Sequence, residues 1–146
     1  MLPQTSQDEL DGTAVEQLRT AAKDASHRAY APYSRYHVGA ALLLHTGEVV
    51  TGCNVENASY RLTCCAEQAA VARAVSEFGP AIRIAAVAVA NADSHLTCQP
   101  CGACRQTIAE FADRTCRIFY PGEGGKPGEC TLADLLPAAF SAQSMG

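Results

Sequence analysis

The chain has 146 residues, of which 48% are hydrophobic and 18% are charged, and its formal net charge at pH 7 is −4. This length suits one domain with a single core, and the composition excludes a disordered or low-complexity chain. Lysine and arginine are scattered singly, so the sequence lacks the basic patch with which nucleic-acid binders neutralise phosphates. We therefore expect no nucleic-acid partner.

The amino-terminal residues carry no targeting or membrane signal. Met1 to Glu9 are polar, without the apolar stretch of a secretory signal, and no segment is long and apolar enough to cross a bilayer. We expect a cytoplasmic protein with no membrane partner, in which residues 1–12 form a flexible segment and 13–146 form one domain. In a reducing compartment its eight cysteines are candidates for metal ligation or catalysis rather than for disulfides.

The first half of the chain predicts a helix and then a hairpin. Apolar residues recur at three- and four-residue steps from Val15 to Ala29, Asp11 or Thr13 can cap the start, and Pro32 ends the helix. The expected elements here are a helix to residue 29, strands over 38–44 and 49–53 joined by a tight turn, and a polar loop over 54–63.

The second half alternates helices and strands. Gly79 and Pro80 stop a run of helix formers, and the apolar stretch after Arg83 suits a strand covered on both faces. This order predicts an α/β fold in three layers, with a mixed five-stranded sheet between helices. The expected elements are helices over 65–78, 101–111 and 131–136, strands over 82–90 and 117–120, a glycine-rich turn over 121–129, and a fifth strand between residue 120 and the last helix.

Two cysteine-bearing segments each stand at a predicted helix start. The first contains Cys65, and the second is a Cys-x-x-Cys pair, Cys101 and Cys104, preceded by Pro100. Helix amino-termini stabilise thiolates, and a Cys-x-x-Cys pair lets two sulfurs converge on one ion. Three thiolates on Zn²⁺ leave a fourth tetrahedral position open, which is typical of a catalytic site. Cys98 and Cys64 are interpreted as spectators.

Glu67 follows Cys65 by two residues, about 200° around a helix, so its carboxylate is not expected to ligate the metal. In the first helical turn it can lie beside the open position and move a proton. Zinc deaminases combine Cys- or His-x-Glu with Pro-Cys-x-x-Cys in this way. The alternative left open is a structural zinc or redox module, in which Cys98 or Cys64 is a fourth ligand and Glu67 is dispensable.

From about Ala14 to Phe140 the sequence resembles the small homotetrameric cytidine deaminases with three cysteine ligands. The resemblance rests on the motifs around the cysteines and on three further segments: Tyr30–Leu42, Gly52–Tyr60 and Leu135–Phe140. It implies one Zn²⁺ per subunit and hydrolytic removal of the C4 amino group of cytidine and 2′-deoxycytidine, a step of pyrimidine salvage, with Glu67 carrying the proton.

The same resemblance implies how the nucleoside is held. Asn54 and Glu56 would hydrogen-bond the ribose, and Tyr36 stands where the family usually has a phenylalanine against the pyrimidine ring. The amide of Ala66 and the carbonyl of Pro100 would read the base edge. Three residues would complete a neighbouring subunit's site: Ala58, Tyr60 and Phe140.

Departures from the family pattern leave other substrates open. Gln68 stands where many relatives with three cysteine ligands have arginine, with Arg105 as a possible substitute near the sulfurs, and Tyr36 adds a hydroxyl near the base. A deaminase of another 4-substituted pyrimidine, such as a blasticidin-type nucleoside antibiotic, is the second hypothesis. A nucleic-acid deaminase would require a basic groove, which this acidic sequence does not provide.

Overall fold

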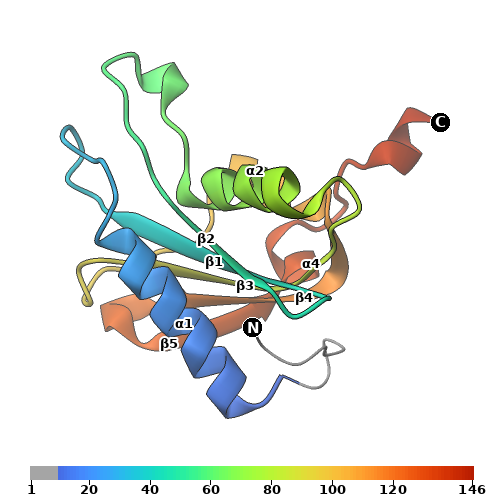
Figure 1. Cartoon of the computed structure of the whole chain (residues 1–146), viewed down its shortest axis with the longest axis horizontal. Helices are drawn as coiled ribbons and strands as arrows, with labels where there is room; N and C mark the ends of the chain where they lie inside the picture. The colour runs from blue at the N-terminus through green and yellow to red at the C-terminus, as the bar shows by residue number, and fades with distance from the viewer. Residues whose placement is uncertain (1–9) are drawn as a thin grey trace.

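The computed structural model describes residues 10–146, and Figure 1 shows their arrangement. Residues 1–9 of the predicted flexible segment lie outside the described residues, while Leu10 is buried against the core. The helices and strands follow in the order α1 (Gly12–Ser26), β1 (Val38–Leu44), β2 (Val49–Cys53), α2 (Ala66–Phe78), β3 (Ile84–Asn91), α3 (Gly102–Ala109), β4 (Ala112–Pro121), β5 (Pro127–Thr131) and α4 (Leu132–Leu135).

The five strands form one mixed sheet in the order β2-β1-β3-β4-β5. Strands β3 and β4 are parallel, and α3 lies in the connection between them; the other three pairs are antiparallel. The predicted α/β fold with a mixed five-stranded sheet is confirmed. No helix among residues 10–146 combines the length and apolar character needed to cross a membrane.

Helices cover both faces of the sheet. Leu18 and Ala22 of α1 pack on one face with Phe119 of β4, whereas α2, α3 and α4 pack on the other through residues such as Ala70, Ile108 and Leu132 (Figure 1). Because both faces are covered, all seven residues of β1 and all eight of β3 are buried. This burial explains why these strands read as continuous apolar runs.

Several helices and strands begin or end at residues other than those predicted. Helix α1 ends at Ser26, three residues earlier than expected, and the short strand predicted over 117–120 is a ten-residue strand, β4. The glycine-rich turn predicted over 121–129 is wrong in its second half, because residues from Pro127 pair with β4 as the edge strand β5. Polar and glycine-rich residues can extend an edge strand when a long neighbour offers free backbone groups.

One edge of the sheet gathers the ends of several elements. Strand β1 begins at Val38, opposite Asn91 at the end of β3, and Gly39 pairs with Cys53 at the end of β2. The segment after β2 is joined to the start of α2 by an isolated bridge, in which the amides of Val55 and Cys64 each donate to the other's carbonyl at 2.9 Å. The sequence motifs therefore meet at this edge.

Close packing of α1 on β1 depends on Gly39, where an added Cβ would run into the α1 backbone at Ala22 and Ser26. We expect Gly39→Ala to lower the free energy of unfolding by about 2–3 kcal/mol or more, since neither backbone can move aside cheaply. Gly12→Ala is the control, because nothing lies within 4 Å of its added Cβ and its effect should stay within about 0.5 kcal/mol. Chemical denaturation measures both, and equal stability of the two variants would contradict this packing.

Candidate active site

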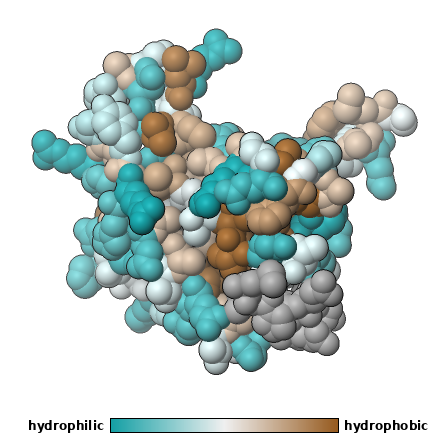
Figure 2. Space-filling view, in the orientation of Figure 1, coloured by the Kyte–Doolittle hydropathy of each residue, from teal (hydrophilic) through white to brown (hydrophobic). Residues whose placement is uncertain are grey.

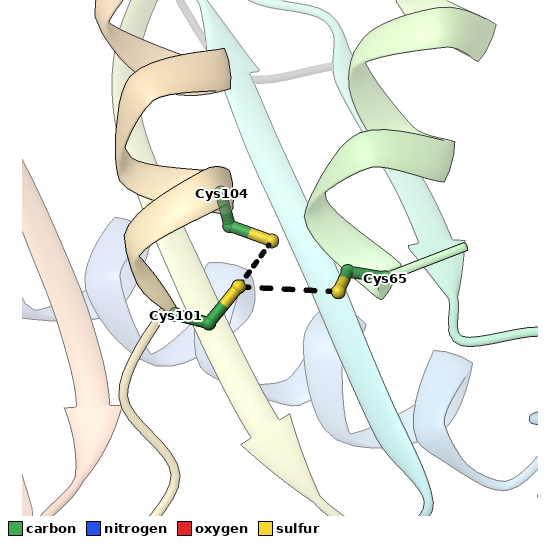
Figure 3. A group of neighbouring side chains, drawn as sticks. All are labelled: Cys65, Cys101 and Cys104. Carbon is green, nitrogen blue, oxygen red and sulfur yellow. Dashed lines mark hydrogen bonds between the residues drawn. The ribbon is translucent and has the colours of Figure 1, made fainter. Parts of the chain in front are cut away.

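Cys65, Cys101 and Cys104 come together from two helix starts (Figure 3). Cys65 is the residue that caps α2, and Cys101 is the one that caps α3; both have extended backbone angles. Cys104 lies one turn into α3, so its sulfur points back toward the same space. The Sγ–Sγ distances are 4.0 Å for Cys65–Cys101 and 3.3 Å for Cys101–Cys104.

The donor set and its spacing fit Zn²⁺. Tetrahedral zinc with Zn–S bonds of ~2.3 Å places its sulfur ligands ~3.8 Å apart, and the three Sγ atoms all lie within 4.8 Å of one another. Among residues 10–146, neither Cys64 nor Cys98 joins this group. The eight cysteines are free thiols. The geometry therefore favours three protein ligands over the four of a structural zinc site.

Without a metal, the pKa values of the Cys65 and Cys104 thiols are shifted in opposite directions. The hydrogen bond from Cys104 lowers the pKa of the Cys65 thiol, which favours its thiolate form. Cys104, the donor in that pair, has its pKa raised. Outside the group, burial raises the pKa of the Cys98 thiol to about 11.

Gln68 and Arg105 occupy the surroundings of the cysteines in different ways. Gln68 closes a capping box at the start of α2. Its side-chain Oε1 accepts from the Cys65 backbone amide at 3.1 Å, and its backbone amide donates to the Cys65 sulfur. The expectation that Arg105 stands in near the sulfurs is not met by its contacts. Its guanidinium instead donates to two carbonyls, of Pro100 at 2.8 Å and of Leu135 at 3.1 Å.

Glu67 is buried in the first turn of α2, with 4% of its surface exposed. Burial raises the pKa of its carboxyl group, while hydrogen bonds from its own amide and from the Cys104 thiol act in the opposite direction. The contact with Cys104 places the carboxylate beside the cysteine group, although Glu67 is not one of the ligand candidates. A carboxyl group that binds a proton readily, next to a metal site, can act in proton transfer.

Glu56 is held by the turn that precedes β1. Its Oε1 accepts from the amides of Tyr33 and Ser34 at 3.0 and 3.1 Å. The Ser34 hydroxyl also hydrogen-bonds the carboxylate and is the main reason that the pKa of Glu56 is lowered. Glu56 is therefore a fixed anion whose other oxygen can accept from a ligand hydroxyl. Sequence reasoning missed Ser34, whose role depends on a turn that brings it to a residue 22 positions away.

The side chain of Asn54, by contrast, hydrogen-bonds mainly to backbone groups. Its Oδ1 accepts from the Val38 amide and its Nδ2 donates to the Tyr36 carbonyl, both at 2.8 Å. The side chain therefore ties the end of β2 to the entry of β1. One Nδ2 hydrogen and one lone pair on Oδ1 remain for a ligand.

Ala66 and Pro100 are both buried next to the cysteines. The Ala66 amide belongs to the first turn of α2, whose donors have no partner within the helix. The three residues predicted to serve a neighbour are exposed: Ala58, Tyr60 at 75% and Phe140 at 61%. The segments around Tyr60 and beyond Phe140 project from the body of the molecule, and Figure 2 shows apolar surface on the projection between β2 and α2.

The comparisons with known proteins agree with this geometry. Residues 13–120 match the family model described as the cytidine and deoxycytidylate deaminase zinc-binding region. A cytidine deaminase of Sporosarcina psychrophila is 43% identical over 131 residues, which cover 90% of this chain and 94% of that protein. The crystal structure of a Burkholderia pseudomallei cytidine deaminase superposes with a TM-score of 0.77 at 43% identity, covering 86% of this chain and 98% of that one.

A blasticidin-S deaminase of Bacillus cereus is less similar, with 29% identity over 113 residues, 74% of this chain and 79% of that protein. The cysteine group, the buried carboxyl group beside it and the family match lead to one conclusion. This chain belongs to the cytidine and deoxycytidylate deaminase family and is a zinc-dependent hydrolytic deaminase.

Proposed function

We propose that this protein converts cytidine and 2′-deoxycytidine to uridine and 2′-deoxyuridine, with one Zn²⁺ per subunit. The observation that carries the proposal is the meeting of three thiols with the buried Glu67 at the sheet edge where Glu56 is fixed. The relative from Sporosarcina psychrophila, matched over nearly its whole length, bears the name cytidine deaminase. Because the products are intact pyrimidine nucleosides, we place the reaction in pyrimidine salvage in the cytoplasm.

Cys65, Cys101 and Cys104 would hold the metal. When bound, Zn²⁺ acts as a Lewis acid that lowers the pKa of a ligated water to about 7. Glu67 takes a proton from the attacking water and delivers it to ring N3 as the C4–O bond forms. It then transfers the second proton to the exocyclic nitrogen, the C4–N bond breaks and ammonia leaves. Burial suits this role, since the raised pKa of Glu67 makes its carboxyl group a better proton acceptor.

The remaining groups bind and orient the nucleoside. Glu56 accepts a hydrogen bond from the ribose 3′-hydroxyl, and Asn54 uses its remaining Nδ2 hydrogen at the same sugar. The Tyr36 ring packs against the pyrimidine. The Ala66 amide and the Pro100 carbonyl read the base edge, and Arg105 fixes the position of that carbonyl through its 2.8 Å hydrogen bond.

We further propose a homotetramer in which subunits complete one another's sites. Ala58, Tyr60 and Phe140 are exposed in the single chain, and two of them are large aromatic residues. Phe140 is held in place by its backbone, because the Gln106 side chain donates to its carbonyl at 3.0 Å. An exposed aromatic ring on a fixed backbone is well placed to cover a nucleoside bound to a neighbour.

Glu67→Gln tests the proton carrier. We expect the variant to fold, to bind zinc as the wild type does and to lose at least about 10³-fold in kcat, because an amide cannot transport the proton. Ultraviolet absorbance follows cytidine conversion, and a zinc assay accompanies it. Glu77→Gln, an exposed carboxylate on the same helix, is the control and should be fully active. A structural zinc module would tolerate both changes.

Glu56→Gln tests the sugar contact. The wild type should discriminate against 3′-deoxycytidine by at least about 100-fold in kcat/KM, because the Glu56 carboxylate, held in place by two backbone amides, would lose its partner on the sugar. In the variant this ratio should shrink, mainly because KM for cytidine rises. An unchanged ratio would show that Glu56 does not contact the 3′-hydroxyl.

A mixture of two inactive variants tests the shared site. Phe140→Ala leaves Glu67 intact, while Glu67→Gln leaves Phe140 intact, so a mixed oligomer contains some sites with both groups. We expect refolding the two variants together to restore a substantial fraction of wild-type turnover, whereas each alone stays poorly active. Activity no greater than the sum of the separate variants, in oligomers shown by mass spectrometry to be mixed, would contradict sharing.

A further inference from the structure

The hydroxyl group of Tyr36 reaches the loop that leads into the Cys-x-x-Cys pair. Its Oη donates to the carbonyl of Thr97 at 2.6 Å. The ring is partly buried and packs against the core cluster that includes Val38 and Cys98. The hydroxyl is therefore committed to the backbone of residues 92–100, which connect β3 to the start of α3.

This loop is fixed at both of its ends. The Lys23 ammonium holds the first end by donating to three acceptors, the carbonyls of Asn91 and Ala92 and the hydroxyl of Ser94, at 2.7 to 3.0 Å. At the second end, the Thr97 hydroxyl and the Cys98 amide both donate to the Pro121 carbonyl at 3.0 Å. The hydrogen bond from Tyr36, at the entry of β1, holds the loop at Thr97. Thr97 lies three residues before Pro100 and four before Cys101.

Asn91, at the end of β3, contributes a buried amide side chain at the start of this loop. The Asn91 side chain is 3% exposed, and its Oδ1 accepts from the Asp93 amide at 2.6 Å. Its Nδ2 has no hydrogen-bond partner among the described residues. Burial and the neighbouring Cys98 thiol raise the pKa of the Tyr36 hydroxyl, while the Asn91 side chain acts to lower it.

We propose that the Tyr36 hydroxyl, through its hydrogen bond to the Thr97 carbonyl, positions the loop ending in Pro100 and Cys101, and that this hydroxyl does not contact the base. The inference rests on the proposed function in one respect, namely that the loop carries a zinc ligand and the carbonyl that reads the base. The ring of Tyr36 then packs against the nucleoside base, while its hydroxyl holds the loop that ends in Pro100 and Cys101. One side chain thereby couples the base pocket to the zinc site.

Tyr36→Phe in the zinc-loaded protein tests this role, because it keeps the ring and removes the hydroxyl with its hydrogen bond to Thr97. The transfer of zinc to a chromophoric chelator should become about three- to tenfold faster, as expected for the loss of a hydrogen bond that holds the loop. The kcat/KM for cytidine should fall by a similar factor. The ratio of turnover of cytidine to that of N4-methylcytidine should not change, since the hydroxyl is absent from the base pocket.

Ile118→Val is the matched control for general loss of stability. Ile118 is fully buried in the middle of β4, between Val87 on β3 and Cys130 on β5. Ile118→Val should lower the melting temperature of the protein about as much as Tyr36→Phe does. It should nevertheless release zinc at the wild-type rate. Zinc release from Tyr36→Phe at the wild-type rate, or equal acceleration in Ile118→Val, would overturn the proposal.

A base-contacting hydroxyl gives a different pattern, in which Tyr36→Phe changes the ratio of the two nucleosides and leaves zinc release unchanged. That result would also overturn the positioning role. Failure of the proposed function is distinguishable, since wild-type protein that holds zinc and deaminates neither nucleoside would refute the substrate assignment. The comparison of zinc-release rates would still decide the role of Tyr36.

Discussion

The amino-termini of α2 and α3 meet at one edge of the sheet, and the rest of the site depends on this meeting. A cysteine caps the start of each helix, so the backbone amides that lack partners within the first helical turn lie next to the thiols. Strand order makes the meeting possible, because β1 begins where β2 and β3 end. The bridge between Val55 and Cys64 then holds the segment of Glu56 against the start of α2.

Charge explains how the surroundings of the cysteines are arranged. Three thiolates around Zn²⁺ carry a net charge of −1, and Glu67 is a further buried acid nearby. Positive helix ends and direct N–H donors offset this charge, and Gln68 contributes through its backbone amide while its side chain caps the helix. The guanidinium of Arg105 donates to the backbone carbonyls of Pro100 and Leu135, so it holds the backbone next to the Cys-x-x-Cys pair rather than contacting sulfur.

Local motifs predicted most of the fold and the metal ligands. The cysteine segments, the helix stops and the long apolar strands depend on neighbours in the sequence, so spacing and residue type sufficed. The edge strand β5 and the early start of β4 depend on pairing between strands, which composition does not reveal. For the same reason the contacts of Tyr36 with Thr97 and of Arg105 with Leu135 could not be predicted, since they join residues 61 and 30 positions apart. The roles of Ala58, Tyr60 and Phe140 came from the resemblance and remain predictions.

The central claim is that three cysteine sulfurs hold the zinc and leave one position free for the reaction. X-ray absorption at the zinc edge of the purified protein measures this directly. The account predicts three sulfur atoms at about 2.3 Å and one lighter atom, oxygen or nitrogen, at about 2.0 Å. Four sulfur atoms would contradict it, because Cys64 or Cys98 would then close the site, and the protein would hold zinc as a structural ion.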